Sequence, residues 1–200
     1  MADIRFVQAD TLKEKPADVS KVGFGRVFTD YMFEMDYNPE EGWHDARIVP
    51  YQDVPLSPAN ATLHYGQAIF EGCKAYRYEG GKAVVFRAKD HIARLNRSAK
   101  ILDIPEVDEK LVYDALMKLI DLEKDWIPDG PGQSLYIRPF IFSTDPYLGV
   151  SVGQYYKMMI ILSPVGAYYA NGFAPVKIMV EDTYVRAPKG GLGAAKTPAN

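Results

Sequence analysis

Three features of the sequence predict an α+β fold. Two segments in the middle of the chain, 90–102 and 108–122, carry apolar residues three to four positions apart, as one face of a helix does. Segments typical of β-strands lie on both sides of them. Of the 200 residues, 48% are hydrophobic and 24% are charged, which is typical of a globular domain and excludes a wholly disordered, collagen-like or coiled-coil chain.

The chain ahead of the helices contains only short β-like runs. Residues 4–7 and 24–28 are two of them. Four prolines between residues 38 and 60 argue against a long helix there. Two more runs, 74–78 and 83–86, lie on either side of a glycine pair, and this arrangement predicts a β-hairpin.

Each helix has a start signal. Asp90 and Asp108 are placed to cap the first turns of the two helices, because a carboxylate accepts hydrogen bonds from the free N–H groups there. Pro105 ends the first helix. Proline and glycine then dominate residues 128–132, which predicts a break before the next element.

The pattern after this break is β. Residues 134–142 alternate between two faces, and residues 156–163 are almost continuously apolar, as in a strand buried on both faces. A third strand is expected at 175–181, followed by a glycine-rich loop at 187–200. The chain ends directly after this loop, and we interpret that as a truncation.

Charge and cysteine content exclude several kinds of protein. The net charge is −3, whereas a chain that binds nucleic acid through bulk charge is basic. The single cysteine, Cys73, has no partner for an internal disulfide and makes a cysteine-based zinc site improbable. The N-terminus resembles no targeting peptide, and the longest apolar stretch, 158–162, is too short to cross a membrane. A cytoplasmic protein is expected.

One helix is rich in basic residues. Arg94, Arg97 and Ser98 share a surface of the first helix, because residues three and four apart are neighbours there. Such a cluster can bind phosphate through the two-pronged guanidinium group. The spacing alone fits a solvated basic helix face better.

Two more basic residues have unusual neighbours. Arg138 lies in the middle of an apolar strand, beside Tyr136 on the same face, and therefore needs either a protein carboxylate or an anionic ligand. Lys196 lies in a loop of small residues. Most lysines are ordinary surface residues, but a lysine held in this way can react with the carbonyl group of a cofactor.

Several common motifs are missing from the sequence. Neither a G-x-G-x-x-G pattern nor a Walker pattern occurs. His44, His64 and His91 do not have the spacing of metal ligands, so no metal site is expected.

Taken together, the segments resemble the branched-chain amino-acid aminotransferases, which belong to the pyridoxal-phosphate enzymes of fold type IV. The resemblance extends over nearly the whole chain from Phe24 onward. The segments that carry it are FTDYM at 28–32, LHYG at 63–66, FEGCKAYR at 70–77, RLNRSA at 94–99, SLYIRP at 134–139, PYLGV at 146–150, LSPVGAY at 162–168, and the stretch from Tyr184 to Lys196. Their order along the chain makes the match more specific than any single motif.

The resemblance implies a cofactor and two residues that bind it. Pyridoxal 5′-phosphate is expected to form a Schiff base with Lys196, which would also move the proton between the substrate Cα and the cofactor. Arg94 is expected to hold the cofactor phosphate. The implied reaction is the ping-pong transfer of an amino group from leucine, isoleucine or valine to 2-oxoglutarate.

The resemblance also implies how substrates are bound. Arg138, beside Tyr136, is expected to bind the distal carboxylate of glutamate or 2-oxoglutarate, while an aromatic pocket accepts the apolar side chains. Leu148 and Val150 are expected to reach the pocket of a second subunit, which makes a homodimer the working unit. The residues expected to line the side-chain pocket are Phe24, Tyr65, Phe70 and Tyr168, with Tyr65 crossing between the subunits.

The family fold has two domains, and three segments of the chain are assigned to them. Residues 1–170 are expected to form the small N-terminal domain, 171–184 a connection, and 185–200 the start of a large domain whose remainder is absent. On this interpretation the 200-residue chain alone is inactive or poorly folded.

Two other functions remain open on the sequence. A D-amino-acid aminotransferase or an aminodeoxychorismate lyase shares the same fold, although the Tyr-Ile-Arg strand and the Leu-Gly-Val loop favour the branched-chain enzymes. A binding module without catalytic activity is the third hypothesis.

Overall fold

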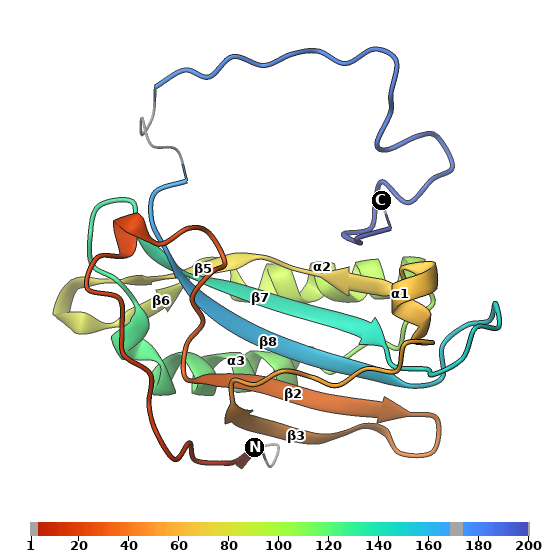
Figure 1. Ribbon diagram of the computed structural model, residues 1–200, viewed down its shortest axis with the longest axis horizontal. Helices are drawn as coiled ribbons and strands as arrows, with labels where there is room; N and C mark the ends of the chain where they lie inside the picture. The colour runs from red at the N-terminus through yellow and green to blue at the C-terminus, as the bar shows by residue number, and fades with distance from the viewer. Residues whose placement is uncertain (1–3, 169–173, 200) are drawn as a thin grey trace.

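A computed structural model gives the structure of residues 4–168 and 174–199 (Figure 1). Its centre is a mixed sheet of eight strands in the order β1-β3-β2-β8-β7-β5-β6, with β4 paired to one end of β7. Helices α2 and α3 lie along one face of the sheet. The strands are β1 (Arg5–Phe6), β2 (Tyr31–Asn38), β3 (Gly42–Pro50), β4 (Ala68–Phe70), β5 (Cys73–Arg77), β6 (Ala83–Val85), β7 (Ser134–Ser143) and β8 (Tyr156–Val165).

Alternation along the strands gives the sheet two different faces. On β2, Phe33 and Met35 are fully buried against the helices, while Met32 belongs to a separate apolar cluster on the opposite side. We call the side opposite the helices the front face. On β7 this face carries Tyr136 and Arg138, because side chains two residues apart point the same way.

The two predicted helices are confirmed. They are α2 (Ala88–Ile101) and α3 (Glu109–Leu122). Asp108 caps α3 by accepting hydrogen bonds from the N–H groups of Lys110 and Leu111. Asp90 does not cap α2, because the helix begins two residues before it.

The α+β class is confirmed, and so are the β5–β6 hairpin and the two long strands β7 and β8. Two expectations about strands were wrong, and one hairpin was not predicted. Residues 24–28 and 175–181 contain no strand. Residues 31–50 contribute the β2–β3 hairpin, which the prolines and charges of this region concealed.

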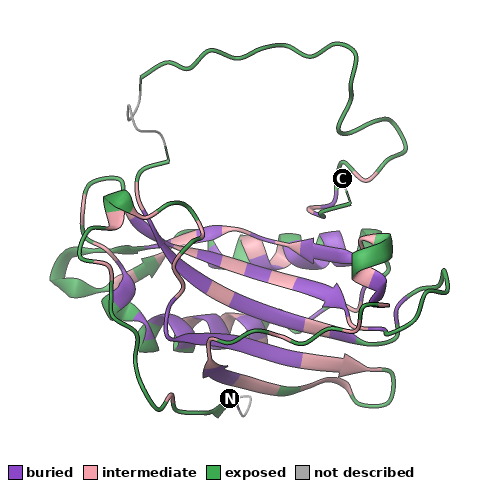
Figure 2. Ribbon diagram, in the orientation of Figure 1, coloured by how far each residue is buried: buried purple, intermediate pink, exposed green. Residues whose placement is uncertain are grey.

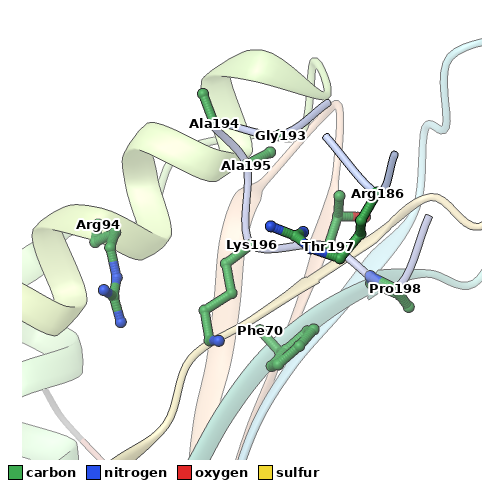
Figure 3. Close-up of a pocket in the computed structure, with 9 residues that line it drawn as sticks. All are labelled: Phe70, Arg94, Arg186, Gly193, Ala194, Ala195, Lys196, Thr197 and Pro198. Atoms are coloured by element: carbon green, nitrogen blue, oxygen red, sulfur yellow. The ribbon is translucent and has the colours of Figure 1, made fainter. Parts of the chain in front are cut away.

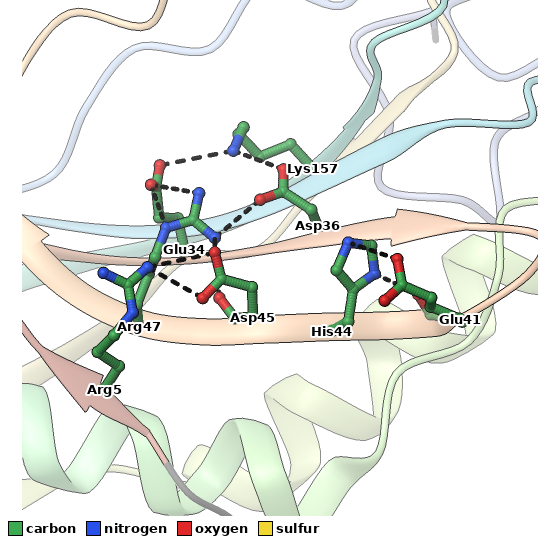
Figure 4. A network of polar contacts seen from close by, with 9 residues as sticks. Arg5, Glu34, Asp36, Glu41, His44, Asp45, Arg47 and Lys157 are labelled. Atoms are coloured by element: carbon green, nitrogen blue, oxygen red, sulfur yellow. Dashed lines mark hydrogen bonds and ion pairs between the residues drawn. The ribbon is translucent and has the colours of Figure 1, made fainter.

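A polar network joins three strands on the front face (Figure 4). The Arg47 guanidinium on β3 lies 2.6 Å from the Glu34 carboxylate and 2.8 Å from the Asp36 carboxylate on β2. The Lys157 amine on β8 lies 2.6 Å from the other Asp36 oxygen. Each charge in this partly buried network has a partner of opposite sign, which offsets the cost of its removal from water.

The chain after β8 leaves the sheet and returns to it near the C-terminus (Figure 1). Residues 174–191 are exposed along their whole length (Figure 2), whereas Ala195 and Thr197 are buried again. The boundary predicted between residues 170 and 171 lies outside the described residues. None of the helices in the described part of the chain has the length and apolar character needed to span a membrane.

Candidate active site

The segment around Lys196 is fixed to α2 and β4 by three hydrogen bonds. The Lys196 N–H donates to the hydroxyl of Ser98 on α2, at 2.9 Å. The Phe70 N–H donates to the Lys196 carbonyl at 3.0 Å, and the Thr197 hydroxyl donates to the Ala68 carbonyl at 2.7 Å. These bonds hold the Lys196 backbone against the body of the protein on both sides of its side chain.

Lys196 and Arg94 line the same cavity, which has a volume of about 600 Å³ (Figure 3). Both side chains point into this space from separate segments, Arg94 from α2 and Lys196 from the C-terminal stretch. The Lys196 amine lies over the ring of Phe70, 4.6 Å from its centre. Arg186 also lines it, so the cavity offers an amine, two guanidinium groups and an aromatic face.

Arg94 is paired with a buried carboxylate. Its Nε and Nη2 atoms lie 2.6 and 2.7 Å from the two oxygens of Glu71, whose side chain is 0% exposed. His91 Nδ1 lies 3.0 Å from Glu71 Oε2. Burial alone would raise the pKa of Glu71, but hydrogen bonds from Arg94 and His91 outweigh burial and lower it. Glu71 is therefore an ionised carboxylate at neutral pH, and Arg94 is more than part of a solvated basic helix face.

Aromatic and cationic side chains continue from this cavity along the front face. The Arg138 guanidinium lies over the Phe70 ring, 4.7 Å from its centre, and donates to the Tyr136 hydroxyl at 2.9 Å. The Tyr136 ring packs edge-on against Phe24, with 4.8 Å between ring centres. Gly72 makes room for this arrangement, because a Cβ there would lie 2.2 Å from the Tyr136 hydroxyl oxygen. These contacts connect the predicted substrate residues to the Lys196 cavity.

Arg138 forms no ion pair with a carboxylate among residues 4–168 and 174–199. Its partly buried guanidinium is held by an aromatic ring and a hydroxyl group, both electrically neutral. Of the two partners that the sequence allowed, a protein carboxylate is thus not found in the described part of the chain. An arginine held in this way is suited to binding an anionic ligand.

Phe24 and Tyr168 line a second cavity, of about 250 Å³, which does not include Lys196. Lys74 of β5 also lines it. Tyr136 contacts Phe24 of this cavity and also Arg138, which lies over the Phe70 ring of the Lys196 cavity. The predicted side-chain pocket is therefore divided in this chain.

Tyr65, Leu148 and Val150 line neither of the two cavities. Tyr65 ends the short helix α1 (Ala61–Tyr65), and its hydroxyl donates to the Leu148 carbonyl. Val150 is 87% exposed. None of the three lines the Lys196 cavity, so the role predicted for them in a second subunit stays a prediction.

Sequence reasoning missed two residues of the site. Glu71 was noted only as part of a matching segment, and its pairing with Arg94 joins residues 23 positions apart, which no local pattern reveals. Ser98 was placed on the solvent-facing surface beside Arg94, whereas it is buried under the Lys196 segment. Its contact joins residues 98 positions apart, which no local pattern can reveal.

Known proteins resemble this chain in sequence and in structure. No family model matches it. A branched-chain-amino-acid transaminase from Bacillus subtilis is 54% identical over 189 residues, which are 94% of this chain and 53% of that protein. The chain is homologous to the branched-chain aminotransferases. It spans about half the length of the curated relatives it matches.

Two solved structures resemble the fold of this chain. The Escherichia coli branched-chain amino acid aminotransferase superimposes with a TM-score of 0.61 at 28% identity, covering 86% of this chain and 52% of that one. A T.th. branched-chain amino acid aminotransferase, solved with pyridoxamine 5′-phosphate, gives a TM-score of 0.50 at 25% identity, covering 67% and 40%. The fold that the sequence predicts, that of the fold type IV aminotransferases, is thereby confirmed.

No metal site is evident in the described residues. Among them, no three His, Cys, Asp or Glu side chains are grouped as a metal ion would need. The Lys196 cavity is lined by three basic side chains, Arg94, Arg186 and Lys196, and by the ring of Phe70, and this lining suits an organic phosphate.

Proposed function

We propose that the protein containing this chain is a branched-chain amino-acid transaminase that uses pyridoxal 5′-phosphate. The observation that carries the proposal is the meeting of Lys196 and Arg94 in one cavity, from segments about half the chain apart. The sequence relatives favour this activity over a D-amino-acid aminotransferase or an aminodeoxychorismate lyase.

The residues of the cavity fit this cofactor. Pyridoxal 5′-phosphate carries an aldehyde, an aromatic ring and a phosphate, and the cavity offers a primary amine, an aromatic face and the guanidinium groups of Arg94 and Arg186. When bound, the cofactor supplies an electron sink for the bond that breaks at the substrate Cα. Binding and orientation fall to the protein.

Each residue then has a defined task. Lys196 carries the cofactor through its amine and moves a proton at the substrate Cα. Arg94 binds the phosphate. Arg138, steadied by Tyr136, binds the distal carboxylate of glutamate or 2-oxoglutarate, and the aromatic surfaces of Phe70 and Phe24 accept apolar side chains. In the net reaction the amino group of leucine, isoleucine or valine passes to 2-oxoglutarate, which gives glutamate and a branched-chain 2-oxo acid.

The proposal includes a cytoplasmic homodimer and a division of the chain into domains. Residues 1–170 would form the small domain, 171–184 a connection, and 185–200 the start of a second domain. Support comes from Ile178, Met179 and Val180, which are 83–87% exposed in this chain and need an apolar cover. Exposed Leu148 and Val150, with Tyr65, would reach the neighbouring subunit and complete its substrate pocket.

The test is an assay of the full-length protein. With pyridoxal 5′-phosphate and 2-oxoglutarate, we expect leucine, isoleucine and valine to give 2-oxo acids, and D-alanine and aminodeoxychorismate to give no product. Turnover of D-alanine or of aminodeoxychorismate in preference to leucine would assign one of the related activities. Failure of the protein to bind the cofactor at all would favour a binding module without catalysis.

A further inference from the structure

Glu71 has no role in the reaction described above, yet it is the most completely enclosed charged residue of the site. Its side chain is 0% exposed, and it is surrounded by hydrogen-bond donors. Besides Arg94 and His91, the N–H of Gly72 lies 3.2 Å from Glu71 Oε2. A buried carboxylate with this many donors is held in one orientation and can in turn hold its partners.

Its contact with Arg94 is a two-bond fork. Nε and Nη2 of Arg94 are directed at separate oxygens of Glu71, which fixes the plane of the guanidinium group. The fork uses Nε and Nη2, and the N–H groups on Nη1 make no hydrogen bond with a described residue, so they can serve another ligand. The Arg94 side chain is still 45% exposed and lines the Lys196 cavity. Arg94 is therefore held on one edge and open on the other.

His91 is a further hydrogen-bond donor to the Glu71 carboxylate. An ionised carboxylate only accepts hydrogen bonds, so the 3.0 Å contact assigns a hydrogen to His91 Nδ1. The imidazole lies one helical turn from Arg94 on α2 and approaches the Glu71 oxygen that also accepts from Arg94 Nη2. The carboxylate thus connects two side chains of one helix face.

The backbone next to Glu71 also holds the lysine segment. The N–H of Phe70 donates to the Lys196 carbonyl, and the N–H of Glu71 donates to the Pro139 carbonyl of β7 at 2.7 Å. The consecutive residues Phe70 and Glu71 therefore connect the lysine segment, the strand β7 that carries Arg138, and Arg94 of α2. A displacement of this dipeptide would move both ends of the cofactor site.

We propose that Glu71 is the positioning residue of the phosphate site: it holds the Arg94 guanidinium in the orientation that binds the phosphate. The inference rests on the proposed function, because it takes Arg94 as the phosphate ligand. An arginine without this partner would lose side-chain freedom when phosphate binds, whereas Arg94 has lost that freedom already in the folded protein. Glu71 acts through Arg94 and does not touch the cofactor.

The experiment compares two ligands that differ only in the phosphate. Dissociation constants of pyridoxal 5′-phosphate and of pyridoxal are measured by absorbance titration with the full-length protein and its Glu71→Gln variant. Both ligands react with the same lysine, so the ratio of the two constants isolates the phosphate. We expect Glu71→Gln to lower the preference for the phosphorylated ligand by about tenfold, and Arg94→Lys, which cannot form the fork, to do the same. The double variant should lose no more of the preference for the phosphorylated ligand than either single variant does.

The remaining outcomes separate the inference from the proposed function. Glu79→Gln, at an exposed turn, is the matched control and should leave the ratio unchanged. An unchanged or raised ratio in Glu71→Gln, with a preference for phosphate in the unmodified protein, would overturn the role of Glu71 alone. No preference for phosphate in the unmodified protein would overturn the proposed function as well. If Glu71→Gln unfolds, as circular dichroism would reveal, a full phosphate preference in Arg94→Lys would overturn the inference.

Discussion

Two buried glutamates of this chain have pKa values that are shifted in opposite directions. Glu71 is surrounded by donors, and its pKa is lowered. Glu123, at the end of α3, is also buried, but it has the N–H of Tyr31 as its main partner and Asp30 as a neighbouring carboxylate. Burial, with the Asp30 charge in addition, raises the pKa of Glu123 to about 7.

The raised pKa of Glu123 makes the stability depend on pH. An unfolded glutamate loses its proton near its ordinary pKa of 4.5, and the folded protein keeps that proton up to about 7. The folded state therefore binds more protons in this window, so the free energy of unfolding contributed by this group falls as the pH rises through it. Glu123→Gln removes the titration, and we expect it to stabilise the protein at pH 8 relative to pH 5 by about 3 kcal/mol.

Urea unfolding at the two pH values measures this difference. The amide introduced by Glu123→Gln keeps an oxygen that can accept from the Tyr31 N–H, so the hydrogen bond is conserved. Glu79→Gln, at an exposed position, serves as the control. Equal dependence of the unfolding free energy on pH in Glu123→Gln and in the unmodified protein would rule out this role of Glu123.

At the scale of elements, the sequence predicted the helices, because helix formation depends on residues close together in the chain. The apolar spacing identified α2 and α3, and Asp108 identified the start of α3. The β2–β3 hairpin was missed because Glu34, Asp36 and Arg47 interrupt its apolar alternation, and only the sheet neighbours that pair with these charges explain them. The apolar residues of 175–181 suggested a strand, but no strand of the described chain pairs with them.

The site shows the same limit. Lys196, Arg94 and Arg138 could be selected from the sequence because their residue types and the matching segments single them out. Their positions relative to one another could not be predicted from the sequence, because these positions depend on contacts between segments far apart in the chain. Helix α2 illustrates the difference: Arg94 and Ser98, one turn apart, contact Glu71 and Lys196 respectively.

Helix α2 is expected to position the lysine through Ser98. Ser98→Ala removes the acceptor of the Lys196 N–H and should weaken the affinity for pyridoxal 5′-phosphate by about tenfold, since an unpaired polar group in a partly buried place is costly. Ser134→Ala is the matched control: that serine is equally buried, but its hydroxyl has no hydrogen-bond partner among the described residues. Absorbance titration gives both dissociation constants. Equal affinities for the two variants would argue against an anchoring role of Ser98.

At the scale of the molecule, one sheet supports both the core and the site. Its helix face packs the buried residues against α2 and α3, while the front face carries the Arg47 network and the side chains leading to Lys196. Two groups of exposed apolar side chains lie in 174–186 and around Val150. The proposed second domain and second subunit would cover these two regions.

The central claim is that Lys196 is the amine that carries the cofactor. Borohydride reduction of the full-length protein with pyridoxal 5′-phosphate, followed by mass mapping of its peptides, tests this claim most directly. We predict a stable pyridoxyl group on Lys196, and on no other lysine of residues 1–200, in an amount that approaches one per chain. A pyridoxyl group on another lysine with Lys196 unmodified, or no adduct at all, would contradict it.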